Sequence, residues 1–199
     1  MAAERWRYWP LPLTLAFCVA GLIPATARLF EATMQTHLLV QMPLLAFCGG
    51  YWVCRSARLR VWLERADPSG GVALVLGSGW LIYWMLPLNL DLATFDPGVR
   101  LLKVVTVPVF LGATLTWSWR QLGPVGRGVM LMEGWAILVR LGWIYLISPV
   151  QLCSNYLIGD QQRTGSLLLG LALISAVLAV IWGVFGPFRK TDRFNLKQQ

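Results

Sequence analysis

Six stretches of about twenty predominantly apolar residues alternate with short polar segments, and this pattern constrains the fold more than any other feature. A helix needs about 20 apolar residues to cross the hydrocarbon core of a bilayer. The backbone finds no water at that depth, and the alternation typical of a membrane barrel is missing, so each stretch is predicted to be a helix. The predicted spans are residues 9–27, 34–54, 72–90, 101–119, 129–149 and 165–185.

The composition agrees with a membrane location. Hydrophobic residues make up 57% of the chain and charged residues only 13%, whereas a soluble domain has about 25% charged residues. These values exclude a disordered chain, a disulfide-rich mini-scaffold and a soluble enzyme. Because the connections are short, the sequence predicts an all-α, polytopic helical bundle that forms a single transmembrane domain over residues 1–199.

Basic residues are distributed unevenly about the predicted spans, and positively charged loops face the cytoplasm in multi-pass proteins. Twelve of them fall on one side: Arg5, Arg7, Arg55, Arg58, Arg60, Arg65, Arg120, Arg127, Arg189, Lys190, Arg193 and Lys197. Four fall on the other side: Arg28, Arg100, Lys103 and Arg163. This asymmetry predicts an even number of spans with both termini in the cytoplasm, and it explains the net charge of +8 without nucleic-acid binding.

The single histidine lies at the non-cytoplasmic start of the second predicted span. Met34, His37 and Gln41 share a helix face, because residues three and four apart are neighbours there, and Met42 follows directly. Thioether and imidazole groups are ligands suited to copper, which makes Met34, His37 and Met42 a candidate metal site. The alternative is that His37 bonds a neighbouring helix while the methionines pack as apolar fillers.

Carboxylates form a second group on the same side. Asn89 lies at the end of the third predicted span, Asp91 directly follows it, and Asp160 precedes the sixth span. A carboxylate close to the bilayer is costly unless it is paired or hydrated, so Asp91 and Asp160 are functional candidates. For Asp160 the alternative is helix capping, since an anion favours the positive end of a helix dipole.

Arg140 lies in the middle of the fifth predicted span, seven residues after Glu133. An unpaired arginine at mid-bilayer costs at least about 2.5 kcal/mol. We therefore expect Arg140 to have a partner carboxylate, with a structural partner inside the protein favoured over an acidic ligand.

Other motifs of catalysis are missing. The four cysteines, Cys18, Cys48, Cys54 and Cys153, are scattered singly, which suits small apolar fillers better than a zinc or redox site. Phosphate-binding loops, HExxH and GxSxG are not found, and one histidine does not assemble a catalytic triad convincingly. The chain is therefore expected not to be an enzyme.

Two segments resemble a known family. The segment from His37 through Gln41 and Met42, which reads His-Leu-Leu-Val-Gln-Met-Pro-Leu-Leu, resembles the motif His-Met-x-x-His-Met-Leu-Leu of CtaG-type cytochrome c oxidase assembly proteins. The segment from Asp160 to Gly165 resembles the Asp-Gln-x-x-Gly segment that precedes a late span in that family. By this resemblance His37 matches the first motif histidine and Asp160 the carboxylate. Gln41 stands where the second histidine would be, and an amide is a poor copper ligand.

The resemblance implies a multi-pass protein of the bacterial inner membrane that helps to assemble a haem-copper oxidase, with copper handled at the periplasmic face. One alternative is an accessory structural subunit of a membrane oxidase or monooxygenase. Another is a small transporter whose path is lined by Arg140, Asp91 and Asp160, although inverted repeats are not visible. The expected partners are membrane lipid and subunits of an oxidase or another membrane complex.

Overall fold

The computed structural model describes residues 23–185, and all regular structure in that range is helical, so the all-α prediction is confirmed there. The elements in chain order are α3 (Pro24–Phe30), η1 (Thr36–Gln41), α4 (Met42–Arg55), α5 (Ala57–Ala66), α6 (Gly71–Met85), α7 (Pro87–Phe95), α8 (Pro97–Thr106), η2 (Val107–Ala113), α9 (Thr114–Gln121), α10 (Pro124–Ile147) and α11 (Ile158–Phe185). The two η elements are π-helical turns. The predicted first span, residues 9–27, lies outside the described residues except for its end, where α3 begins.

Among the described residues, four continuous helical stretches are long and apolar enough to cross a membrane: Thr36–Arg55, Pro97–Gln121, Pro124–Ile147 and Ile158–Ile181. They match the predicted spans 34–54, 101–119, 129–149 and 165–185. The bent pair α6 and α7 makes a fifth candidate and corresponds to the predicted span 72–90. The chain is thus a helical membrane protein, with four candidate spans within residues 23–185, or five if the bent pair is one span. The count of six and the cytoplasmic termini stay predictions.

The prediction of one continuous helix over residues 72–90 is wrong at Leu86. The chain bends by 68° between α6 and α7. Pro87 disfavours helical geometry in the residue before it, and Leu86 is extended, with φ −66° and ψ 129°. The Asn89 amide Nδ2 then donates to the Tyr83 carbonyl at 2.7 Å, which satisfies one acceptor at the end of α6.

The segment after the second span is also different from its prediction, because it contains α5 where the sequence indicated only a loop. Ser56 caps this helix by accepting from the Leu59 amide at 3.2 Å. Arg58, Trp62 and Arg65 are exposed on α5. A short helix with both basic and aromatic exposed residues suits the membrane surface.

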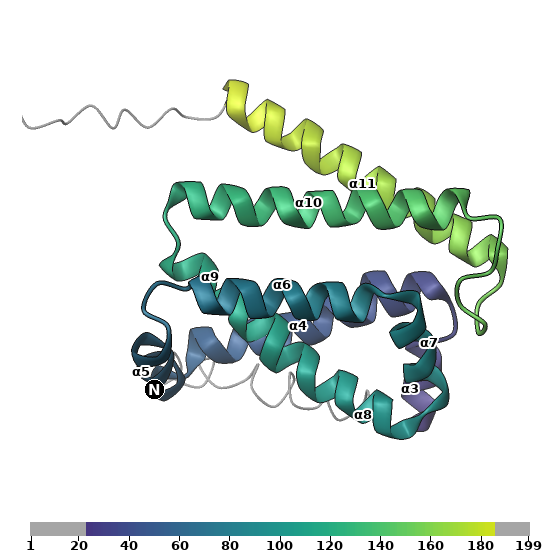
Figure 1. Ribbon diagram of the computed structural model, residues 1–199, viewed down its shortest axis with the longest axis horizontal. Helices are drawn as coiled ribbons and strands as arrows, with labels where there is room; N and C mark the ends of the chain where they lie inside the picture. Colours follow the sequence, from purple (N-terminus) through teal and green to yellow (C-terminus); the bar gives the residue numbers. More distant parts are fainter. Residues whose placement is uncertain (1–22, 186–199) are drawn as a thin grey trace, which may run out of the picture.

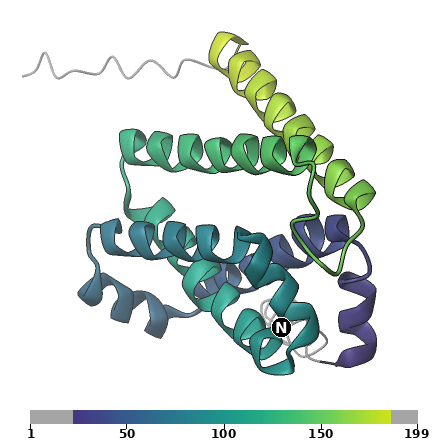
Figure 2. The same ribbon diagram turned by 45° about the vertical axis from the view of Figure 1, so that its right-hand side comes forward.

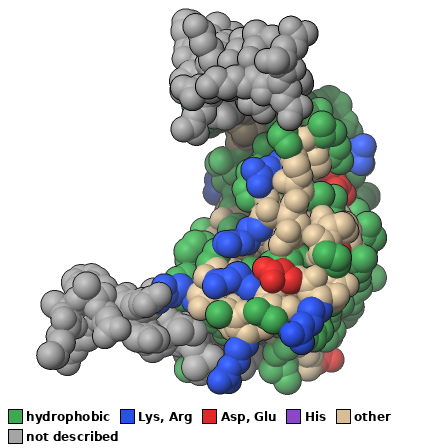
Figure 3. All heavy atoms as spheres, turned by 90° about the vertical axis from the view of Figure 1, so that its left-hand side faces the viewer, with side chains coloured by type: hydrophobic (Ala, Val, Ile, Leu, Met, Phe, Trp, Pro, Cys, Tyr) green, Lys and Arg blue, Asp and Glu red, His purple; other side chains and the backbone are tan. Residues whose placement is uncertain are grey.

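Basic side chains gather at the end of the molecule that carries α5, which we call the basic end (Figure 3). Arg60, Arg120 and Arg127 line one hollow there, and Arg127 lies over the Trp119 ring at 5.5 Å. The loops after the second and fourth predicted spans therefore share one end of the protein. Their clustering is what the charge asymmetry predicts for a cytoplasmic face.

The turn at residues 67–71, between α5 and α6, is held by hydrogen bonds at the basic end. The Asp67 carboxylate accepts from the Ala73 amide at 2.8 Å, and the Asp67 carbonyl accepts from Trp117 Nε1 at 2.9 Å. Gly70 adopts φ +73°, a conformation that favours glycine. Burial raises the pKa of the Asp67 carboxyl, but hydrogen bonds from Ala73, Ser69 and neighbouring amides outweigh this and leave the pKa below its usual value.

The helices are arranged in two parts (Figures 1 and 2). The elements from α4 to α9 form one layer, with α3 and α7 at the end opposite α5. We call this opposite end, which includes η1, the start of α8 and the loop 148–157, the polar end. The hairpin of α10 and α11 covers the layer from one side, and α11 diverges from α10 away from the polar end. The α10–α11 and α4–η2 pairs have the most extensive contacts.

Glycines allow the closest helix crossing, between α4 and η2. A Cβ atom on Gly49 would collide with the Pro108 carbonyl, and one on Gly112 would collide with the Ala46 carbonyl. The two backbones therefore touch directly, as small residues permit in membrane proteins. A similar reciprocal contact joins Gly142 of α10 to Gly165 of α11.

Candidate functional site

A buried lysine organises the polar end. The Lys103 ammonium of α8 donates to Glu31 Oε1 at 2.8 Å, to His37 Nε2 at 2.8 Å and to Gln41 Oε1 at 3.0 Å. An ammonium has three donors, so these three acceptors use all of them. Lys103 and Gln41 have 0% exposure and His37 has 1%. We call Glu31, His37, Gln41, Arg100, Lys103 and Tyr156 the polar cluster.

Local structure explains how two side chains of one helix reach the same ammonium. Residues four apart in an α-helix are offset by about 40°, but the wider π-helical turn of η1 brings them closer to one line. His37 and Gln41 are the second and last residues of η1. Glu31 follows directly after α3, as its C-cap residue. The cluster thus joins α3, η1 and α8.

His37 is held at both ring nitrogens. The ammonium of Lys103 only donates, so His37 Nε2 must accept and the ring must be neutral, with its proton on Nδ1. Nδ1 then donates to the Tyr156 hydroxyl at 2.8 Å. Burial, followed by the charges of Glu31 and nearby groups, raises the pKa of Tyr156, so the hydroxyl stays protonated.

Glu31 neutralises only part of the positive charge. Its second oxygen, Oε2, lies 3.2 Å from the Arg100 guanidinium, so one carboxylate faces two cations. Gln41 Nε2 and Arg100 Nε are buried without an acceptor among the described residues. An unsatisfied buried donor costs about 1–3 kcal/mol. The cluster therefore carries a net positive charge and unused donors, and it is suited to holding acceptors or anions more than cations.

The predicted metal ligands lie in the same region. Met34 and Met42 are buried in the main apolar core together with Cys153 and Tyr156. Within residues 23–185 no group of three His, Cys, Asp or Glu side chains could hold a metal ion. Copper binding at His37 requires Lys103 to release Nε2. The assignment of Met34, His37 and Met42 to copper stays a prediction.

The two segments that resemble the assembly family lie near each other at this end. Gln35 Nε2 donates to the Asp160 carbonyl at 3.2 Å, across 125 residues of sequence. Asp160 lies in the first turn of α11, which begins at Ile158. That position favours the dipole interpretation of its carboxylate. Gln161 is buried and accepts from the Leu152 amide at 2.9 Å, fixing the loop before α11.

Asp91 also has a structural partner. Its carboxylate accepts from the Ser154 amide at 3.1 Å and from the Asn155 amide at 3.0 Å, and it bonds the Ser154 hydroxyl. Asp91 thereby ties α7 to the loop between α10 and α11. Asn89, as described, closes the bend before α7. Both residues hold the polar end together without entering the polar cluster.

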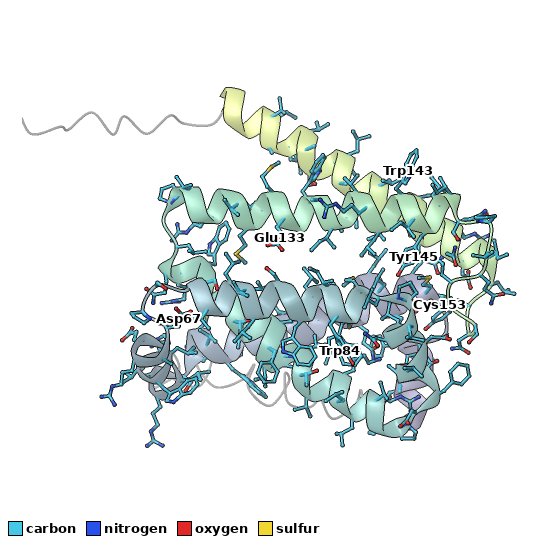
Figure 4. All side chains as sticks on the ribbon, viewed as in Figure 1. Asp67, Trp84, Glu133, Trp143, Tyr145 and Cys153 are labelled. Carbon is cyan, nitrogen blue, oxygen red and sulfur yellow. The ribbon has the colours of Figure 1, made fainter. Side chains whose placement is uncertain are left out.

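Cys153 and Tyr145 complete the junction between the α10–α11 hairpin and the bend that joins α6 to α7 (Figure 4). The Cys153 thiol donates to the Pro87 carbonyl at 3.6 Å, and the Tyr145 hydroxyl donates to the Met85 carbonyl at 3.3 Å. Burial, and then the charge of Asp91, raises the pKa of Cys153 to about 12. The thiol is therefore protonated and inert, as expected for an apolar filler.

Arg140 does not have the expected partner inside the described protein. Arg140 is exposed on α10, and the ion pairs among the described residues join Glu31 to Arg100 and to Lys103. Glu133 instead accepts from the Ser78 hydroxyl at 3.0 Å and faces α6 (Figure 4). The expectation of an internal carboxylate for Arg140 is wrong within residues 23–185.

The sequence does not identify four members of the polar cluster as candidate site residues: Glu31, Arg100, Lys103 and Tyr156. The charge asymmetry groups Lys103 with the loop residues, although Lys103 lies inside the predicted span 101–119. A lysine within a span is itself an indication of a partner. Tyr156 had no comparable indication, because only the fold brings the loop 148–157 against η1.

Comparisons of the chain with protein-family models, with curated proteins and with solved structures gave no match. The fold and its spans define a multi-pass helical membrane protein.

Proposed function

We propose that this protein is an assembly factor for a haem-copper oxidase of the bacterial inner membrane, and that it acts as a scaffold without enzymatic activity. The observation that carries the proposal is that two hydrogen bonds bring the family-like segments close together at the polar end. They lie far apart in sequence, but Gln35, two residues before the first segment, bonds the Asp160 backbone, and His37 bonds Tyr156, four residues before the second segment. Their position at one end of the bundle supports a role at a single membrane face, and the resemblance implies the periplasmic face.

The polar cluster supports a scaffold that does not carry copper. The ammonium of Lys103 lies among Glu31, His37 and Gln41 and uses the Nε2 lone pair that a metal would need. Gln41 stands at the position of the second motif histidine, and its amide oxygen suits an ammonium better than Cu(I). The Lys103 ammonium therefore occupies the position beside His37 Nε2 that a copper ion would need.

Deletion of the gene tests the assembly role. We expect membranes that lack the protein to contain less assembled oxidase, seen as a loss of the haem absorbance of the oxidase, and the wild-type chain to restore it. The Gln35→Ala variant removes the side-chain bond to Asp160 and should restore it only in part. Gln162→Ala, an exposed neighbour of Gln161, is the matched control. Normal oxidase content after deletion would refute the assembly role.

Copper loading tests the scaffold proposal separately. The purified wild-type protein should bind no stoichiometric Cu(I), and His37→Ala and Met34→Ala should behave identically. A copper stoichiometry near one per chain that is lost in both variants would overturn the scaffold proposal. That outcome would instead support copper handling by His37, Met34 and Met42.

The second candidate function is an accessory subunit of a membrane oxidase or monooxygenase. The low burial of α10 favours it, since this helix leaves a long face free for another subunit. Purification in mild detergent distinguishes the two functions. Stoichiometric retention in the mature complex supports an accessory subunit, whereas association only with immature forms supports an assembly factor.

A further inference from the structure

α10 is the least buried of the four continuous candidate spans. Only 11% of the residues in its apolar window are buried inside the protein, against 50% for Thr36–Arg55. Figure 4 shows Glu133 pointing from α10 toward α6 and Trp143 pointing away from it. The exposed residues Val129, Met132, Arg140, Trp143 and Ile147 recur at helical spacing, and we call them the α10 stripe.

Arg140 is the charged residue of the α10 stripe and lies deep in the span. It is about 10 Å along the helix from Ile147 and about 24 Å from Pro124, at 1.5 Å per residue. Helical side chains lean toward the N-terminus of their helix. The guanidinium therefore leans toward the interior of the span. To reach the nearer interface, at the Ile147 end of α10, the side chain would have to point in the opposite direction.

The acidic residues that the structure describes do not supply a partner. None of the described carboxylates lies within 4.0 Å of the Arg140 guanidinium. Glu64 and Asp67 lie at the basic end, and Glu133 bonds Ser78. The other four described carboxylates lie near the polar end: Glu31, Asp91, Asp96 and Asp160. The two remaining acidic residues of the sequence, Glu4 and Asp192, lie outside the predicted spans.

We infer that the α10 stripe binds a transmembrane helix of another protein that carries an Asp or Glu at the depth of Arg140. An exposed guanidinium within a hydrocarbon layer requires an opposite charge, and a carboxylate accepts from its paired N–H groups in a bidentate geometry. The apolar residues on either side of Arg140 pack against the rest of that helix. This inference does not depend on the partner being an oxidase.

A second copy of the chain is a poorer partner. Two copies with the same topology are related by an axis along the membrane normal, so equal residues lie at equal depth. Two α10 stripes facing each other would bring one Arg140 near the other, and like charges repel. A lipid phosphate is also a poorer partner, because headgroups lie at the interface and Arg140 leans away from the nearer one.

The test uses a synthetic helix of defined sequence as the probe. The full chain is labelled at its exposed Cys54, with Cys18 replaced by serine. It is reconstituted in phosphatidylcholine vesicles with a polyleucine helix that carries an acceptor dye and one Glu at matching depth. Energy transfer should show about tenfold tighter binding than to the same helix without Glu. Arg140→Gln should abolish this preference, and Arg140→Lys should retain part of it.

The control variant is Leu173→Gln, an exposed position on α11, which should keep the preference. Unchanged thermal melting of all variants verifies folding. The inference is overturned if the wild-type protein has no preference for Glu, or if Arg140→Gln keeps it. It is also overturned if phosphatidylglycerol in the vesicles removes the preference, which would identify a lipid partner. Energy transfer between two labelled copies that is lost in Arg140→Gln would identify self-association instead.

Discussion

The residues of the polar cluster differ in how many of their polar atoms have a hydrogen-bond partner. Lys103 has every donor satisfied, whereas Gln41 keeps its oxygen on Lys103 and leaves its Nε2 without an acceptor. The orientation of the Gln41 amide is thus set by Lys103, since a flipped amide would bring donors together. The sequence predicts His37 and Gln41 as neighbours on one face. It does not predict Lys103 as their common partner, because that contact depends on how α8 packs against η1.

Replacement of Lys103 by methionine should destabilise the protein strongly. Methionine fills a similar volume but leaves Glu31, His37 and Gln41 without their donor. Removal of one member of a buried ion pair costs about 3–5 kcal/mol. The measurement is unfolding of the purified protein in mixed detergent micelles.

Arg163→Gln is the control for Lys103→Met, because Arg163 is an exposed cation. Its stability should match that of the wild-type protein. The double variant Glu31→Gln with Lys103→Met should be more stable than the sum of the two single effects predicts. Strictly additive effects would show that the ion pair contributes no coupling.

Asp67 gives a pH-dependent contribution at the opposite end. Its pKa in the folded protein lies below 3.8, the ordinary value, so its stabilising effect is present above that pH and is lost as the pH falls through the folded value. Asp67→Asn should be less stable than wild type by about 1 kcal/mol at neutral pH. The difference should shrink below about pH 4 as the wild-type carboxyl takes up a proton. Unfolding measured across this pH range checks both points, and a constant difference would contradict them.

At the scale of elements, apolar length predicts where helices cross the membrane, and local chemistry decides where they break. Four predicted spans match helices of the structure because about twenty apolar residues leave few other solutions. The bend at Leu86 follows from Pro87, because a proline disfavours helical geometry in the residue before it. A criterion based on apolar length alone does not detect this local effect. α5 escapes the same criterion because it is too short and too basic to span, although it is helical.

The close crossing of α4 and η2 predicts that alanine is tolerated less well at a glycine in the crossing than at a glycine in open space. Gly112→Ala should destabilise the protein by about 1–3 kcal/mol, because its Cβ would strike the Ala46 backbone. Gly79→Ala is the matched control: nothing lies within 4 Å of its added Cβ. That variant should be neutral or more stable by about 0.5–1 kcal/mol, since alanine favours a helix. Thermal melting in detergent compares the two, and equal melting temperatures would contradict the direct backbone contact.

For the whole molecule, the charge asymmetry and the structure agree on which segments share an end. α5 and the start of α10 lie at the basic end, and the loop 148–157 lies at the other (Figure 1). The sequence predicts this segregation because loop charge depends on topology and not on packing. It could not predict that the α10–α11 hairpin leaves most of α10 uncovered, since lipid-facing and protein-facing apolar residues have similar composition.

Cysteine labelling tests this arrangement in intact cells. Val125 and Leu157 are strongly exposed, at 82% and 74%, near opposite ends of the molecule. In a background without Cys18 and Cys54, Val125→Cys should be labelled only after the membrane is permeabilised, and Leu157→Cys before. Glu64→Cys on α5 should behave like Val125→Cys. Labelling of positions 125 and 157 from the same side would contradict the topology.

The polar cluster also sets an order for biogenesis. Its contacts join residues 66, 72 and 119 positions apart, and Tyr156 is the last of them to be synthesised. Glu31 and His37 leave the ribosome long before Lys103. The N–H group at His37 Nδ1 does not have its acceptor, Tyr156, until the final hairpin has been inserted. The early half of the chain must therefore tolerate bare polar groups within the translocation machinery, and maturation is complete only when the last helix arrives.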